Sequence, residues 1–130
     1  PVRGFLPYQG HDIGLVVTPP ADRAALRAKL EALFPGGVTT LEFGSDRPRT
    51  VALLTGSGMS ALDSLAPAGL DTFITGELKR SAFNRAQEER LNLYLCGHYA
   101  TETFGVQALA SELATRFDLP WTFLPSGCPL

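Results

Sequence analysis

Hydrophobic and polar positions along the chain form blocks that predict strands and helices in turn. Short apolar runs bounded by glycine, proline or polar clusters are typical of strands in a buried sheet. Longer segments repeat their apolar residues every three or four positions, which indicates helices with one apolar face. Strands are therefore expected at 12–18, 38–43, 50–55, 71–75, 91–96 and 121–124, and helices at 21–34, 60–65, 81–90 and 103–117.

The order of these elements indicates the fold class. Strands and helices alternate through the second half, which is the signature of a layered α/β domain. The strands at 38–43 and 50–55 are separated by a short turn and are expected to pair antiparallel, so the sheet is mixed or mostly parallel, with helices flanking it. Residues 1–11 contain prolines and glycines and are interpreted as a linker or cut end, and residues 12–130 as a single domain.

Composition narrows the classes of function. Of 130 residues, 45% are hydrophobic and 18% charged, as is usual for soluble globular proteins. A net charge of −2 argues against nucleic-acid binding, which favours a basic face. No apolar run approaches the roughly 20 residues of a membrane span. Cys96 and Cys128 form no disulfide framework, and Cys96 is expected to be a small buried hydrophobe. A cytoplasmic protein is expected.

The strongest candidate chemistry follows the apolar run 91–96. Gly97 allows a sharp turn, and His98 and Glu102 follow at a spacing of four. If a helix begins near His98, the imidazole and the carboxylate lie on one side, one turn apart. This is the carboxyl end of a strand, where α/β sheets bind ligands, and the pair would make half of a divalent-metal site. The alternative is a solvated helix face that binds nothing.

Four further residues are candidates for supporting or substrate-binding roles. Ser57 and Gly58 join a strand to a helix start, where free backbone N–H groups could hold an anion, although the sequence favours a tight turn with Ser57 or Ser60 capping the helix. Glu77 also follows a strand and is expected to line the same crevice as His98. Thr101 could hydrogen-bond a metal ligand or cap the helix.

Several of these segments together resemble one family. The stretches that carry the resemblance are 71–77, 97–102, 105–106 and 108–109, with 10–15 and 55–58 upstream in the expected order. They resemble the closing half of the NIF-three-like family, also called dinuclear metal centre proteins or GTP cyclohydrolase 1 type 2 homologues. The resemblance covers essentially the whole chain, and Gly-His-Tyr-Ala-Thr-Glu at 97–102 is its most specific part.

The resemblance implies two divalent metal ions in a cleft between two similar α/β halves. His98 and Glu102 match the ligands of the C-terminal half, and an adjacent histidine pair and an aspartate of the N-terminal half supply the others. This chain has no adjacent histidine pair, and its only other histidine is His11. We therefore interpret it as a C-terminal portion with an incomplete site. Nitrogen and oxygen donors suit Zn, Mn, Fe or Ni, and two ligands do not choose among them.

Two functions follow from this resemblance. The first is a metal-dependent hydrolase acting on a small, nucleotide-like substrate, with GTP cyclohydrolase as the label that the family carries. The alternative is a non-catalytic, ring-forming assembly or metal-handling protein, for which a hexamer is one form. Candidate contact residues are Phe117, Trp121 and Phe123, although core packing is the more frequent use of such aromatic side chains. In both, the partner is the N-terminal half of the same protein. The portion alone is expected to be inactive and to expose an apolar face.

Overall fold

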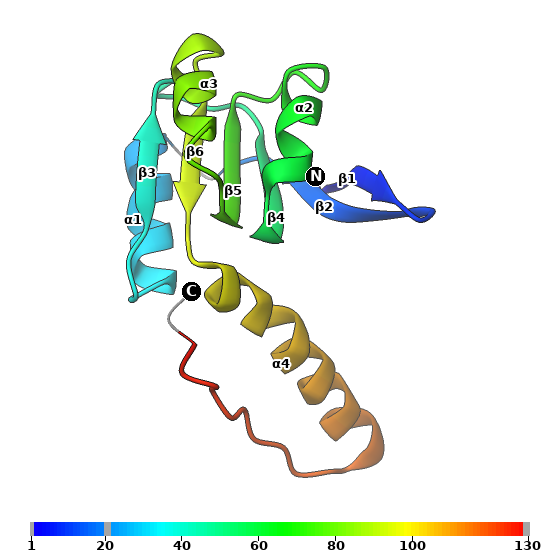
Figure 1. Ribbon diagram of the computed structural model, residues 1–130. Coiled ribbons are helices and arrows are strands. Elements are labelled where there is room, and N and C mark those ends of the chain that lie inside the picture. The colour runs from blue at the N-terminus through cyan, green and yellow to red at the C-terminus, as the bar shows by residue number, and fades with distance from the viewer. Residues whose placement is uncertain (1, 20–21, 129–130) are drawn as a thin grey trace.

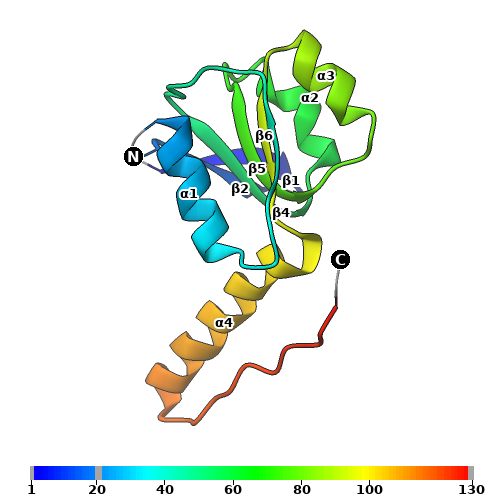
Figure 2. The same cartoon turned by 90° about the vertical axis from the view of Figure 1, so that its left-hand side faces the viewer.

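A computed structural model describes residues 2–19 and 22–128 of the protein. A six-stranded mixed sheet forms the central layer, with strand order β1-β2-β4-β5-β6-β3, as expected for a layered α/β domain. Helix α1 covers one face of the sheet, and α2 and α3 cover the other. Helix α4 extends away from the end of the sheet at which β4, β5 and β6 finish (Figures 1 and 2). The elements are β1 (Arg3–Tyr8), β2 (His11–Val17), α1 (Arg23–Leu33), β3 (Thr39–Glu42), β4 (Val51–Ser57), the short 3-10 helix η1 (Met59–Ala61), α2 (Leu62–Leu65), β5 (Thr72–Glu77), α3 (Ala82–Glu88), β6 (Asn92–Leu95) and α4 (His98–Phe117).

The core lies on both faces of the sheet because alternate strand residues point in opposite directions. Phe73 of β5 joins the apolar cluster under α2 and α3, whereas its neighbour Ile74 joins the cluster under α1. In β6, Leu93 likewise belongs to the first cluster and Tyr94 to the second. Cys96 is buried in the second cluster, as expected, and this burial raises the pKa of its thiol to about 11.

Helix α1 is stabilised by a side-chain cap at its start and by the burial of its apolar face. The Asp22 carboxylate accepts a hydrogen bond from the Ala25 amide at 2.9 Å, which satisfies one of the free N–H groups of the first turn. Leu26 and Leu30, four positions apart, are buried against the sheet. The predicted start of this helix at residue 21 lies outside the described residues, and its end agrees with the prediction to within a residue.

The predicted pairing of the strands at 38–43 and 50–55 is wrong. Strand β3 pairs antiparallel with β6, and β4 pairs with β2 and β5, so β5 and β6 separate β3 from β4. The buried Asn92 of β6 explains this arrangement because it binds the loop between them: its Oδ1 accepts from the Gly44 amide at 3.0 Å, and its Nδ2 donates to the Ser45 carbonyl at 2.8 Å. The loop is thereby held beside β6.

Residues 3–8 are part of the sheet, which corrects their interpretation as a linker within 1–11. Strand β1 forms a hairpin with β2 through Gln9 and Gly10, which both have positive φ (48° and 84°) as a two-residue hairpin turn requires. Phe5 is buried in the core. Pro7 is compatible with this strand because β1 is an edge strand. The proline and glycine content therefore marks an edge hairpin.

The predicted strand at 121–124 is also absent, because the described residues 119–128 contain neither helix nor strand. Asp118 ends α4 in the left-handed conformation (φ 53°), and the segment then runs back alongside the helix (Figure 1). The Ser126 amide donates to the Tyr99 hydroxyl at 2.8 Å near the start of α4. Among the described residues, no helix has the length and apolar character needed to cross a membrane.

Candidate metal-ligand site

The candidate site lies where three parallel strands end. Strands β4, β5 and β6 run parallel, so their carboxyl ends meet at one edge of the sheet, and α4 begins there (Figure 1). Gly97, with φ 93°, turns the chain from β6 into α4, whose first residue is His98. The amides of Cys96 and Gly97 donate to carbonyls of Thr75 and Gly76 at 2.9 Å, which fixes the first turn of α4 against β5.

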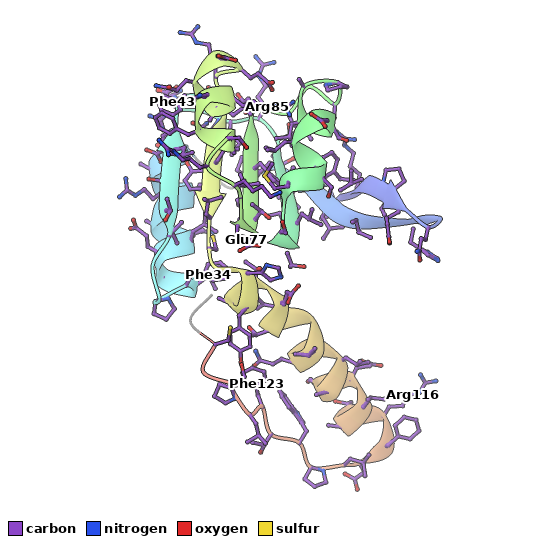
Figure 3. All side chains as sticks on the ribbon, viewed as in Figure 1. Phe34, Phe43, Glu77, Arg85, Arg116 and Phe123 are labelled. Atoms are coloured by element: carbon purple, nitrogen blue, oxygen red, sulfur yellow. The ribbon has the colours of Figure 1, made fainter. Side chains whose placement is uncertain are left out.

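His98 and Glu102 lie together on one side of this first turn, as their spacing predicts. The His98 Nε2 and Glu102 Oε1 atoms are 3.3 Å apart. On the other side of the ring, Nδ1 lies 3.0 Å from Oε1 of Glu77, which ends β5 (Figure 3). The His98 side chain is 36% exposed and the two carboxylates are more exposed, so solvent reaches all three groups.

The two carboxylates change the protonation of the imidazole. The hydrogen bond to Glu77 raises the pKa of His98 above its usual 6.5, and attraction to the charges of Glu102 and Glu77 adds to this effect, while desolvation opposes it. In the metal-free state the ring therefore holds its proton to higher pH than a free imidazole does. A cation at Nε2 would have to displace that proton.

Thr101 connects the site to β4. This buried residue accepts a hydrogen bond from the Gly56 amide at 2.9 Å, and its hydroxyl lies 3.0 Å and 2.9 Å from the carbonyl oxygens of Gly97 and His98, to either of which it can donate. Gly97 is the N-cap of α4, so Thr101 is not the cap. Its observed contacts are to backbone, and they fix the position of the turn that carries His98.

Two glycines that the sequence reasoning did not single out lie directly against the pair. A Cβ on Gly56 would stand 2.6 Å from Glu102 Oε1 and 3.1 Å from His98 Nε2, and the residue has φ +67°. A Cβ on Gly76 would stand 2.7 Å from His98 Cα and 2.8 Å from Thr101 Oγ1. The signal that could have found them is a glycine near the end of a strand, which often marks a close approach of other groups.

Ser57 and Gly58 lie beside the site without the features of an anion cradle. The Gly58 amide already donates to the Glu77 carbonyl at 3.1 Å, so it is not free for a ligand. Gly58 is the N-cap of η1, and neither Ser57 nor Ser60 caps a helix here, because η1 and α2 have no side-chain cap. The contact made by Gly58 joins the end of β4 to the end of β5.

A shallow hollow of about 330 Å³ opens beside the pair, lined by Glu77, His98, Tyr99, Glu102 and Cys128. Within residues 2–19 and 22–128, no three His, Cys, Asp or Glu side chains form a group that could hold a metal ion. The site therefore offers one imidazole nitrogen and one carboxylate at the edge of the sheet. A cation bound there with full coordination would need donors from elsewhere.

Comparison with known proteins identifies the class to which the chain belongs. The family model for Duf34/NIF3 (NGG1p interacting factor 3) matches residues 6–127, and the chain belongs to this family. A protein of Deinococcus radiodurans named GTP cyclohydrolase 1 type 2 homolog is 38% identical over 97% of the chain and 49% of that protein. A Yersinia pestis protein of the same name is 37% identical over 95% and 48%.

Solved structures agree with this assignment. Protein ybgI, described as of unknown function, superimposes with a TM-score of 0.84 and 32% identity, covering all of this chain and 52% of that one. TTHA1606 from Thermus thermophilus superimposes with a TM-score of 0.74 and 36% identity over 94% and 50% of the two chains. The chain thus spans about half the length of these relatives, and the resemblance seen in the sequence is confirmed.

Proposed function

We propose that this chain supplies half of a divalent-metal site in a metal-dependent hydrolase that acts on a small, nucleotide-like substrate. The observation that carries the proposal is the pairing of His98 Nε2 with Glu102 Oε1, 3.3 Å apart at the carboxyl edge of the sheet. That edge is where α/β sheets bind ligands. The ring-shaped homo-oligomer implied by the resemblance and the cytoplasmic location expected from the composition stay predictions.

The donor set fits a divalent cation chemically. An imidazole nitrogen and a carboxylate oxygen suit Zn, Mn, Fe or Ni, and these two donors do not select one of them. Glu77 supports this interpretation because it accepts from Nδ1 of His98, which leaves Nε2 for a metal. A carboxylate on the second ring nitrogen is the usual way in which proteins orient a ligating histidine. The glycines at 56 and 76 keep space beside the pair free of side chains.

In the proposed reaction, two bound ions would lower the pKa of a water molecule and stabilise the charge that develops on the substrate. The residues of this chain hold and orient donors. His98 is oriented by Glu77, Glu102 projects beside it, and Thr101 fixes their helical turn to β4. The nucleotide-like substrate is suggested by the names of the relatives alone.

A non-catalytic assembly or metal-handling protein is the second candidate. It is favoured by a row of exposed apolar side chains on α4, since large exposed apolar patches mark interaction surfaces. The two candidates differ in one measurable property. A hydrolase turns over a substrate and loses that turnover in His98→Ala, whereas an assembly protein binds metal or partners without turnover.

Metal content of the natural full-length protein, measured by mass spectrometry, tests the proposal first. We expect about two ions per chain in the wild type and in the control His11→Ala, which removes the second histidine of the present 130-residue sequence, an exposed residue of β2. We expect His98→Ala to lose metal. Hydrolysis of nucleotides, GTP included, is then screened with both variants. Metal-free wild-type protein would refute the metal site, and metal without any turnover would support the assembly function.

A further inference from the structure

Helix α1 covers only part of its face of the sheet. It lies toward the β3 edge, and the β1–β2 hairpin forms the other edge (Figure 1). Val51 of β4 and Ile74 of β5 belong to the buried cluster under α1, and Val17 of β2 packs against it. Ile13 and Leu15, at alternate positions of the same strand, point to the same face and are half exposed. The described elements therefore leave apolar surface of β2 in contact with solvent beside α1.

This surface borders an apolar groove of about 330 Å³. Leu33 and Phe34 at the end of α1 form one wall and Phe104 of α4 forms another, and the two phenylalanine rings meet edge to face with their centroids 5.6 Å apart. Among the described residues that line the groove, none has a charged side chain. The polar ones are three threonines, Thr55, Thr75 and Thr101. An apolar cavity of this size with a few polar side chains is typical of small-molecule binding sites.

The threonines place one end of the groove beside the candidate metal ligands. Thr101 immediately precedes Glu102 in α4, and Thr55 immediately precedes Gly56 in β4. A Cβ on Gly56 would stand 2.6 Å from Glu102 Oε1. Because consecutive Cα atoms are about 3.8 Å apart, the Cα of Thr55 lies within roughly 8 Å of that carboxylate. One small molecule can therefore occupy the groove and reach the pair.

The groove favours an apolar group over one that needs hydrogen bonds. The Thr75 hydroxyl donates to the Gly56 carbonyl at 3.3 Å, and the Thr101 hydroxyl accepts from the Gly56 amide at 2.9 Å, so both already have backbone partners. A polar group buried without a hydrogen bond costs free energy, whereas a hydrocarbon gains by leaving water. The imidazole and the carboxylates at the end of the groove favour the opposite kind of group.

We propose that the groove binds the apolar part of a small molecule whose polar part is held at the metal pair. The substrate is then amphipathic, with a hydrolysable polar group at one end and a hydrocarbon chain or ring at the other. The inference rests on the proposed function in one respect, because it places the polar end at metal ions bound by His98 and Glu102. It narrows the substrate of that function by requiring an apolar group that fits the groove.

Isothermal titration calorimetry of the metal-loaded natural full-length protein tests this binding. The probes are straight-chain carboxylates from butanoate to decanoate, because a carboxylate binds divalent ions and each added methylene lengthens only the apolar part. We expect the dissociation constant to fall about three- to fourfold for each methylene until the groove is full.

Two substitutions place a carboxylate in the groove. Leu15→Glu and Leu33→Glu change side chains of β2 and α1 that are 47% and 58% exposed, so the fold does not depend on their burial. In both variants the dependence of affinity on chain length should disappear. Leu119→Glu is the matched control, because Leu119 is 56% exposed and lies beyond the far end of α4. This control should keep the full dependence on chain length.

A flat series in the wild type would overturn the proposal, and it is the result expected if another part of the protein or a second copy fills the groove. A chain-length dependence that survives both groove substitutions, or that is also lost in Leu119→Glu, would overturn it as well. Metal content is measured on the same samples and on His98→Ala. Chain-length dependence without bound metal supports the groove and refutes the metal site, whereas bound metal with a flat series leaves the metal site intact and refutes the groove.

Discussion

Replacing Thr101 with valine is expected to loosen the contact between α4 and β4. The substitution keeps the β-branched shape and removes the oxygen that accepts from the buried Gly56 amide at 2.9 Å. A buried donor left without a partner costs about 1–3 kcal/mol. Loss of the hydroxyl contact to the Gly97 carbonyl costs less, because this carbonyl still accepts a hydrogen bond from the Thr101 amide at 3.1 Å. We therefore expect the free energy of unfolding to fall by about 2 kcal/mol.

Urea denaturation followed by circular dichroism measures this loss. With a slope of about 2 kcal/mol/M, the midpoint should fall by about 1 M. Thr115→Val is the matched control, because the Thr115 hydroxyl donates to the Ser111 carbonyl at 3.0 Å on an exposed part of α4, where water replaces the bond. The control should change stability by less than about 0.5 kcal/mol. Equal midpoints for the two variants would refute the importance of the Thr101–Gly56 contact.

Two further predictions concern the pair itself. In metal-free protein, NMR titration should give His98 a pKa above 6.5, and Glu77→Gln should lower that pKa, since the Glu77 hydrogen bond is the largest cause of the shift. An unchanged pKa of His98 in Glu77→Gln would contradict the assignment of Glu77 as the main cause of the shift. Because the folded-state pKa of His98 is raised, the stability that this contact contributes is fully present below pH 6.5 and is lost as the pH rises through the folded-state pKa. Gly56→Ala and Gly69→Ala should each cost about 1–2 kcal/mol on urea unfolding, because both glycines have left-handed φ (+67° and +68°). Only Gly56→Ala should also weaken metal binding in full-length protein, since a Cβ at 56 meets Glu102 and one at 69 meets nothing within 4 Å; equal metal affinities would argue against a site at this position.

Local patterns were sufficient to predict most elements of the fold. Buried runs such as β5 and β6 stand between clear breakers, and α1 repeats its apolar residues at helical spacing. Pairing could not be predicted in this way, because it depends on contacts between distant residues. Asn92 binds a loop 47 and 48 positions away in sequence, and this contact holds β3 beside β6. The edge hairpin of β1 was missed because Pro7 argues against a strand unless the strand lies at an edge.

The geometry of the His98 and Glu102 pair could be predicted because it depends on helical spacing alone. The position of Glu77 followed from the rule that parallel strands end at one edge, and its contact with Nδ1 agrees with the expected shared crevice. Gly56 and Gly76 could not be found in the same way. These glycines matter because they have no side chain at points where segments distant in sequence come close together. The distances between such segments do not follow from the local pattern of residues.

The attachment of α4 at one end has a mechanical consequence. Its length is about 30 Å, at 1.5 Å per residue, and the fixed point is the first turn around Thr101. The helix is then a lever: a rotation of about 10° at Thr101 moves Phe117, some 24 Å away, by about 4 Å. Conversely, a displacement of a few ångströms at the far end of α4 corresponds to displacements of only tenths of an ångström at His98 and Glu102, which lie close to the fixed point. Whatever holds Phe117 in place thereby also sets the orientation of the imidazole and the carboxylate.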